Sequence, residues 1–153
     1  MAPLMNEKPS GRRSKDIGTV AETAVVRFLQ RNGWPSAERR ALRGEHDAGD
    51  VTGTPGVAWE VKGGKAAKVA SDMQVQKWLG ETERERINAG ADVGVLVMQR
   101  GGYGPARCGM WWAVLSLRWL MPQADQISST ATVRLTLDDM CQVLRHRGWG
   151  DPL

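Results

Sequence analysis

Two carboxylates and a lysine near the middle of the chain have the types and order that metal-assisted phosphate hydrolysis uses. Asp50 precedes a Gly-Thr-Pro-Gly turn, and Glu60 and Lys62 follow that turn in the sequence WEVK. Carboxylate oxygens are preferred ligands of Mg²⁺, and a bound cation polarises a phosphate and lowers the pKa of a bound water. A lysine beside the cation can orient that water or offset the charge that grows on the phosphate. The three residues are therefore candidates for one metal-dependent hydrolytic site.

The element that must position Glu60 and Lys62 is a strand. The apolar run at residues 57–62 predicts one. Side chains alternate along a strand, so Trp59 and Val61 would lie on the packing face. Glu60 and Lys62 would project together from the other face, roughly 7 Å apart along the strand. The alternative is an ordinary Glu–Lys pair on a solvated sheet face.

Asp50 reaches that face only with one kind of turn. An odd-length turn centred on Pro55, or a bulge, would place Asp50 opposite Glu60. An even-length turn centred between Thr54 and Pro55 would place it opposite Trp59, on the wrong face. The chemistry therefore predicts an odd-length turn or a bulge in an antiparallel hairpin.

A third carboxylate lies on a helix earlier in the chain. From Asp16 onwards apolar residues recur at three- and four-residue spacing, which predicts a helix that ends near Gly33. Glu22 is bordered on this helix by apolar residues such as Val25 and Val26, and a carboxylate in such surroundings is costly without a partner. We therefore expect a metal ion or a basic side chain beside Glu22. The alternative is a glutamate at the edge of the apolar stripe that reaches solvent.

The rest of the pattern predicts helices and strands in alternation. The capping box Ser71-x-x-Gln74 opens a helix over 71–89 that Gly90 ends, and the continuous apolar run at 91–99 is typical of a strand buried on both faces. With the strand at 57–62 these elements form a βαβ unit, so the two strands should be parallel. The other expected elements are a short strand at about 37–42, strands at 110–115 and 132–136, and a helix at 137–147.

These elements predict an α/β fold with a small mixed β-sheet flanked by helices. We expect a single domain over residues 16–153, with a core at about 16–114 and a C-terminal extension at 115–153. The extension could complete the core, cover an edge strand or build a dimer. Residues 1–15, rich in Pro, Ser, Gly and basic side chains, are expected to form a flexible basic tail.

The composition favours a cytoplasmic protein with an acidic partner. The 153 residues carry a net charge of +4, which favours nucleic acid as that partner. The two cysteines, Cys108 and Cys141, lack the spacing of a zinc site or a disulfide framework, so we expect both to be reduced. No apolar run reaches the length of a membrane span, and the N-terminus has no apolar signal core. We therefore expect no membrane partner.

The motifs, in this order, resemble those of the PD-(D/E)XK nuclease superfamily, and most of all its Holliday junction resolvase branch, which includes phage-type members. The stretches that carry the resemblance are GTVAETAVVRFLQRNGW, ERRALRGEHDAGDV and WEVK, and the resemblance covers about residues 14–100. It implies a restriction-endonuclease-like core in which metal is held by Glu22, Asp50 and Glu60, while Lys62 completes the (D/E)-x-K pair. Gly49 stands before the aspartate, where that motif has a proline.

The same resemblance implies a cofactor, a further side chain and a substrate. The cofactor would be Mg²⁺, with Mn²⁺ as a substitute. A glutamine on the following helix would assist, either Gln74 or Gln76, and Gln74 is favoured because it lies nearer the helix start. The substrate would be DNA, in particular branched DNA such as a four-way junction. Because resolvases cut two strands symmetrically, a homodimer is expected. If the chain is phage-encoded, it would act in the cytoplasm of the bacterial host.

Basic residues lie close in sequence to these acids and suit phosphate contacts. The planar guanidinium of arginine can bind two phosphate oxygens at once. The alternative for each is a solvated surface charge. The candidates for DNA binding are Arg39, Arg40, Arg43, Lys65 and Lys68.

The leading expectation is a Mg²⁺-dependent DNA endonuclease, and two other functions stay open. One is a restriction-type or repair-type nuclease with the same core, although the chain has no evident extra recognition domain. The other is a non-catalytic DNA-binding module, against which the intact set of Asp50, Glu60 and Lys62 argues.

Overall fold

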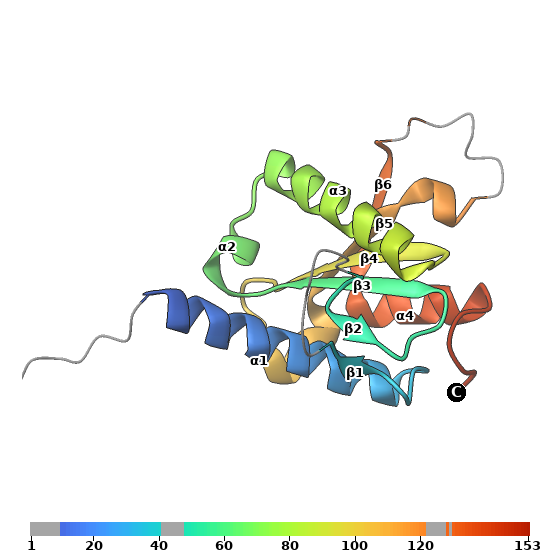
Figure 1. Cartoon of the computed structure of the whole chain (residues 1–153), viewed down its shortest axis with the longest axis horizontal. Helices are drawn as coiled ribbons and strands as arrows, with labels where there is room; N and C mark the ends of the chain where they lie inside the picture. The colour runs from blue at the N-terminus through green and yellow to red at the C-terminus, as the bar shows by residue number, and fades with distance from the viewer. Residues whose placement is uncertain (1–9, 41–47, 122–127, 129) are drawn as a thin grey trace, which may run out of the picture.

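The computed structural model describes residues 10–40, 48–121, 128 and 130–153 (Figure 1). Its helices are α1 (Ser10–Arg31), α2 (Gly64–Lys68), α3 (Asp72–Ala89) and α4 (Leu137–His146), and its short 3₁₀ segments are η1 (Pro105–Met110) and η2 (Leu117–Trp119). Its strands are β1 (Glu38–Arg39), β2 (Val51–Thr52), β3 (Val57–Lys62), β4 (Val93–Met98), β5 (Trp112–Ser116) and β6 (Thr132–Thr136).

The strands form a four-stranded sheet in the order β3-β4-β5-β6 and a separate pair of β1 with β2. β3 and β4 are parallel, as the βαβ pattern predicts, and the other two pairs in the larger sheet are antiparallel. Every residue of β4 is buried, which is why its sequence is apolar without alternation. The predicted α/β class, with a small mixed sheet flanked by helices, is confirmed.

Helices cover both faces of the larger sheet (Figure 1). One face packs against α1 and α4 and carries the larger hydrophobic core, which includes Trp59 and Val61. The opposite face packs against α3 through a smaller apolar cluster. Because side chains alternate along β3, Glu60 and Lys62 project to the α3 side.

The C-terminal segment completes the larger core. β6 pairs with β5 along its whole length. α4 follows directly and fully buries Leu137, Met140, Cys141 and Leu144 against the sheet. Of the three roles considered for residues 115–153, the described residues therefore show two: the segment completes the core, and β6 covers the edge of β5. The expected end of the core at residue 114 is too early.

Both cysteines are free and buried. Burial raises the pKa of the Cys108 thiol to about 11 and that of the Cys141 thiol to about 12. Both thiols are therefore protonated at neutral pH, which makes them poor nucleophiles.

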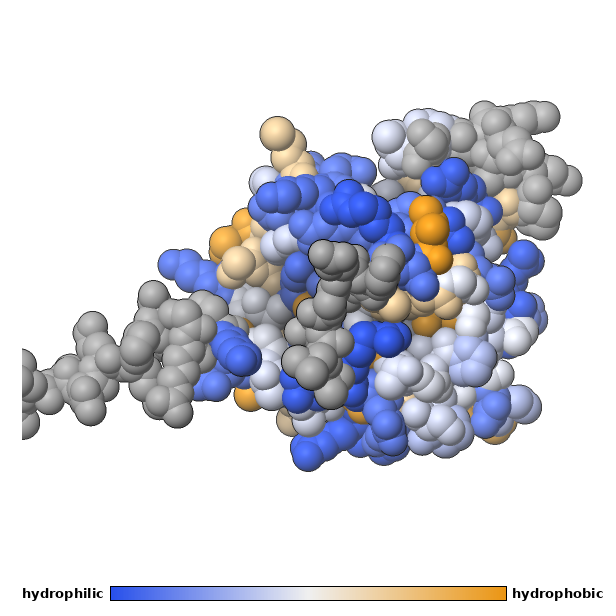
Figure 2. Space-filling model, in the orientation of Figure 1, coloured by the Kyte–Doolittle hydropathy of each residue, from blue (hydrophilic) through white to orange (hydrophobic). Residues whose placement is uncertain are grey.

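The face of the molecule in view in Figure 2 is mainly hydrophilic, and its hydrophobic residues form separate patches. None of the helices in the described part of the chain is both long and apolar enough to cross a membrane.

Three segments differ from the expectations. α1 begins at Ser10, so residues 10–15 are helical and not a flexible tail, because a residue added to an existing helix gains a hydrogen bond without a new nucleation cost. Residues 1–9 lie outside the described part of the chain. The segment Gly64–Lys68, for which the sequence pattern predicted no helix or strand, forms α2 and buries Ala67. β1 is shorter than the expected strand at 37–42, of which residues 41 and 42 are not among those described.

Candidate active site

Asp50 lies against the outer edge of β3. Its N–H donates to the carbonyl of Trp59 at 2.9 Å, and the N–H of Val61 donates to Asp50 Oδ2 at 2.7 Å. β3 is the terminal strand of its sheet, so these main-chain groups point away from β4. The Asp50 carboxylate therefore lies in line with the sheet, beside the peptide group that joins Glu60 to Val61. The residue is only 4% exposed.

The turn before β3 is even in length. A main-chain hydrogen bond of 3.1 Å closes the turn Thr54–Val57, in which Pro55 and Gly56 are the central residues. Gly56 has a φ of 81°, the left-handed conformation that a type II turn requires at this position. β2 pairs with β1 and not with β3. The predicted odd-length turn, and the antiparallel pairing of Asp50 with Glu60, are therefore wrong.

The main chain of Asp50 explains the difference. The N–H of Arg40 donates to the Asp50 carbonyl at 2.9 Å, so the main chain pairs on the β1 side. The Asp50 carboxylate then supplies the acceptor that the N–H of Val61 needs at the outer edge of β3. Gly49 permits this close approach, because its φ is 100° and a Cβ there would lie 2.9 Å from the Trp59 carbonyl oxygen.

Lys62 contacts side chains from two elements on the α3 side of the sheet. Its Nζ lies 3.1 Å from Glu60 Oε1 and 3.4 Å from Glu81 Oε2, and it lies over the Trp78 ring, 5.6 Å from the centroid. Burial acts to lower the pKa of Lys62, but the attraction of Glu60 and Glu81 outweighs burial and raises the pKa above its ordinary value of 10.5. Lys62 is therefore a cation at neutral pH.

Glu60 retains one oxygen that the described residues do not satisfy. The residue is 6% exposed, and its Oε2 has no hydrogen-bond partner within the described part of the chain. A buried carboxylate oxygen without a donor is costly. This oxygen is therefore well suited to contact a cation.

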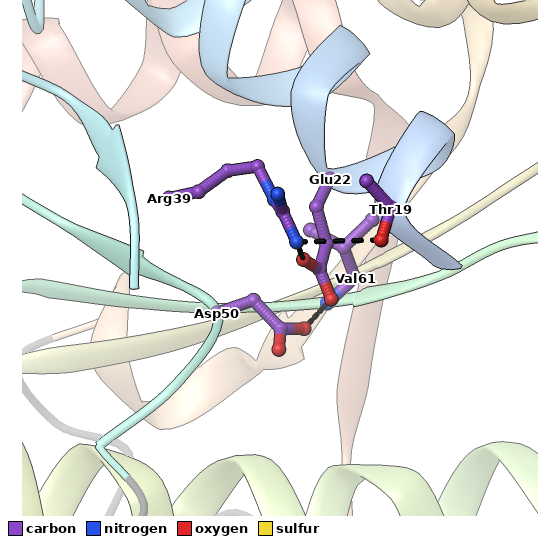
Figure 3. A network of polar contacts seen from close by, with 5 residues as sticks. All are labelled: Thr19, Glu22, Arg39, Asp50 and Val61. Carbon is purple, nitrogen blue, oxygen red and sulfur yellow. Dashed lines mark hydrogen bonds and ion pairs between the residues drawn. The ribbon is translucent and has the colours of Figure 1, made fainter. Parts of the chain in front are cut away.

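Glu22 is partnered by a basic residue, which was one of the two partners expected for it. Arg39 donates from Nε at 3.0 Å and from Nη2 at 2.9 Å to Glu22 Oε2, and Nη2 also lies 3.4 Å from Thr19 Oγ1. Figure 3 shows Glu22 and Asp50 extending towards Val61 from two different elements, Glu22 from α1 and Asp50 from the segment before β2. Glu22 is 7% exposed, so a third carboxylate is buried near this edge of the sheet.

These carboxylates fit a cation only in part. Among the described residues, no group of three or more His, Cys, Asp or Glu side chains is placed to hold a metal ion. Asp50 lies beside the peptide that follows Glu60, and Glu60 has an unsatisfied oxygen, so these two are the candidate ligands. Glu22 is already engaged with Arg39 through Oε2, so this ion pair would compete with a cation for its carboxylate.

The start of α3 favours Gln74 over Gln76 as the assisting glutamine. Gln74, Trp78 and Glu81 follow the i, i+4, i+7 spacing of one helix face, and Trp78 and Glu81 contact Lys62. Gln76 instead lines a pocket with residues at the far end of β5, such as Ser116. Trp78 and Glu81 were not among the expected site residues, although their spacing from Gln74 was a signal that could have found them.

The expected DNA-binding residues occupy different positions. Arg39 binds Glu22, and Arg40 donates from Nε to the Gly49 carbonyl at 3.0 Å. The side chains of both arginines therefore bind within the protein, Arg39 to α1 and Arg40 to the segment before β2. Exposed Lys65 and Lys68 line a pocket between α1 and α2 together with Gln99. Arg43 lies outside the described residues.

Comparisons with protein-family models, with curated proteins and with solved structures found no match for this chain. Fold alone does not determine function, so function must be argued from the chemistry of the site.

Proposed function

We propose that this protein is a Mg²⁺-dependent DNA endonuclease that hydrolyses phosphodiester bonds. One observation carries the proposal. The buried Asp50 carboxylate accepts a hydrogen bond from the N–H of Val61, the residue between Glu60 and Lys62. Two carboxylates from different segments and one lysine thus meet at a sheet edge, where a phosphate could approach. A solvated Glu–Lys pair would not require two buried acids.

Asp50 and Glu60 would hold the cation, and Glu22 would add a third ligand if released from Arg39. When bound, Mg²⁺ would polarise the scissile phosphate and lower the pKa of a water. Mn²⁺ is the expected substitute.

Lys62 would stabilise the negative charge that grows on the phosphate. Its raised pKa keeps it protonated, so it would act as a cation and not as a general base. Glu81 would keep Lys62 in position while Glu60 turns towards the cation. Gln74, on the same face of α3, would help to orient water or phosphate.

The resemblance to Holliday junction resolvases favours branched DNA as the substrate and a two-fold homodimer as the acting form. A homodimer would present two such sites to the two strands that must be cut. This proposal also places the protein in the cytoplasm, where its two cysteines would stay reduced.

The test is cleavage of a synthetic four-way junction and of a linear duplex of the same sequence, each with Mg²⁺ or with EDTA. We expect cutting that requires Mg²⁺ and is faster on the junction. Equal cutting of both substrates would support a nuclease without a preference for junctions, which is the behaviour expected of a repair-type enzyme. DNA binding with no metal-dependent cutting would leave only a non-catalytic binding module.

A further inference from the structure

Three arginines and two aromatic rings form a continuous alternating row at one end of the larger sheet. The guanidinium carbon of Arg107 lies 4.8 Å from the centroid of the Tyr103 ring, and that of Arg100 lies 5.0 Å from the same ring. Arg100 also lies 3.9 Å from the Trp112 ring, and Arg134 lies 5.8 Å from it. We call Arg107, Tyr103, Arg100, Trp112 and Arg134, in this order, the arginine–aromatic row.

The row links four cation–π contacts through shared side chains. Proteins hold about one significant contact of this kind per 70–80 residues, which corresponds to about two in a chain of 153 residues. Here four contacts join side chains from the segment after β4, η1, β5 and β6. The Arg100 guanidinium contacts both rings, and its Nη1 also donates to the Met110 carbonyl at 3.5 Å.

Trp112 is the member of the row that strand pairing connects to the candidate active site. Lys62 pairs with Met98, Met98 with Trp112, and Trp112 with Thr136, so these residues form one line across four strands. Two strand spacings separate Lys62 from Trp112, which places their Cα atoms about 10 Å apart. Lys62 and Trp112 also share the sheet face that packs towards Trp78 of α3. The row therefore passes close to Lys62 at Trp112 and continues to Arg134 on β6.

The row carries positive charge that the described residues do not neutralise. The ion pairs found among them join Glu22 to Arg39, Lys62 to Glu60 and Glu81, and Arg86 to Glu83, and none of these pairs includes an arginine of the row. Arg107 and Arg134 are exposed at its two ends, and Arg100, Tyr103 and Trp112 are partly exposed.

We propose that the arginine–aromatic row binds the phosphate backbone of a duplex arm of the DNA whose scissile phosphate lies at Lys62. This proposal rests on the proposed function and extends the binding surface beyond the residues expected from the sequence. Guanidinium groups lie over both rings, so the rings orient the arginines and do not stack on bases. Contacts of guanidinium edges with phosphate oxygens are independent of base sequence. The row therefore acts as a positioning surface and not as a reader of sequence.

The test compares two double variants with wild type, all in EDTA so that binding is measured without cutting. R107Q/R134Q removes the two exposed charges of the row while keeping side-chain length. R31Q/R147Q is the matched control, because it removes two exposed charges, at the ends of α1 and α4, that do not belong to the row. Affinity is measured on two duplexes of unrelated sequence at salt concentrations between 50 and 200 mM. Over this range, rising salt weakens the binding of a protein with about 6–10 phosphate contacts by about 10³–10⁵. Circular dichroism is the control that checks whether both variants are folded.

We expect R107Q/R134Q to bind both duplexes at least about tenfold more weakly and to reduce the slope of log affinity against log salt by about 2. R31Q/R147Q should bind like wild type. Equal binding by the two double variants, or no binding by wild type, would overturn the assignment of the row. If binding depends on the row but wild type shows no metal-dependent cutting, the endonuclease proposal is wrong and the assignment of the row to DNA binding is kept. If wild type cuts DNA but R107Q/R134Q binds as tightly as wild type, the assignment of the row is wrong and the endonuclease proposal is kept.

Discussion

Lys62 is held by two carboxylates that belong to different elements. Glu60 is its neighbour on β3, and Glu81 reaches it from α3. If Glu60 bound a cation, the contact with Glu81 would still leave Lys62 an anionic partner. Trp78 lies below the ammonium group and restricts its position further. At the scale of single residues, this arrangement holds a positive charge between the buried Glu60 and the partly exposed Glu81.

Replacement of Lys62 with methionine should reveal what this charge contributes to stability. The variant keeps the apolar stem but leaves the buried Glu60 without its cation, so we expect unfolding free energy to fall by about 1–3 kcal/mol at pH 7. The exposed Lys77, on the same helix as Glu81, gives the matched control K77M, with an expected change within about 0.5 kcal/mol. Urea unfolding monitored by circular dichroism measures both.

The pH dependence of this difference has a definite sign. The folded pKa of Lys62 is raised above 10.5, so the folded state holds this proton more tightly than the unfolded state. The stabilisation is fully present below pH 10.5 and is lost as pH rises through the raised pKa. The gap between wild type and K62M should therefore stay constant from about pH 7 to pH 9 and shrink above pH 10.5. A gap that widens there, or one no larger than that of K77M, would contradict the assigned contacts.

At the scale of elements, the spacing of apolar residues predicted most strands and helices but not how the chain runs between them. β6 and α4 were predicted at or within a residue of their bounds, because Thr136 and Gly148 mark a helix start and stop. The position of Asp50 was not predictable in this way. It depends on whether the Asp50 carbonyl pairs with β1 or with β3, and alternation along one strand contains no information on that choice.

For the site residues too, the sequence predicted the local arrangement along one strand but not the contacts between elements. Alternation correctly separates Trp59 and Val61 from Glu60 and Lys62. The contact of Lys62 with Glu81 was missed, because it depends on how α3 packs across β3, and helix periodicity does not specify packing between elements.

The role of α4 in the core can be tested with one buried and one exposed substitution on that helix. Leu144 is fully buried against the sheet, so L144A should lower the unfolding free energy by about 2–5 kcal/mol. Gln142 is exposed on the same helix, and Q142A should change it by less than about 0.5 kcal/mol. Thermal unfolding in parallel samples gives the comparison. Similar, small effects for both would show that α4 is not part of the cooperative core.

At the scale of the whole molecule, the fold brings three buried acids to one end of a mixed sheet. Glu22 comes from α1, Asp50 from the segment before β2 and Glu60 from β3, and the separate β1–β2 pair lies alongside (Figure 1). The arginine–aromatic row continues from this end across β5 to β6. A DNA arm laid along that row would reach Lys62, which joins the proposed site to the proposed binding surface.

The central claim is that Asp50 acts in metal-dependent cutting of DNA, and D50N tests it most directly. Asparagine keeps an oxygen that can accept the hydrogen bond of the Val61 N–H, so the fold should be preserved while the negative charge is lost. The measurement is the single-turnover rate of junction cleavage with Mg²⁺ for wild type, D50N and the control D151N, an exposed aspartate near the C-terminus. We predict that D50N binds the junction in EDTA like wild type but cuts at least about 100-fold more slowly, equivalent to about 2.7 kcal/mol of transition-state stabilisation, while D151N is unchanged. Cutting by folded D50N at the wild-type rate would contradict the account.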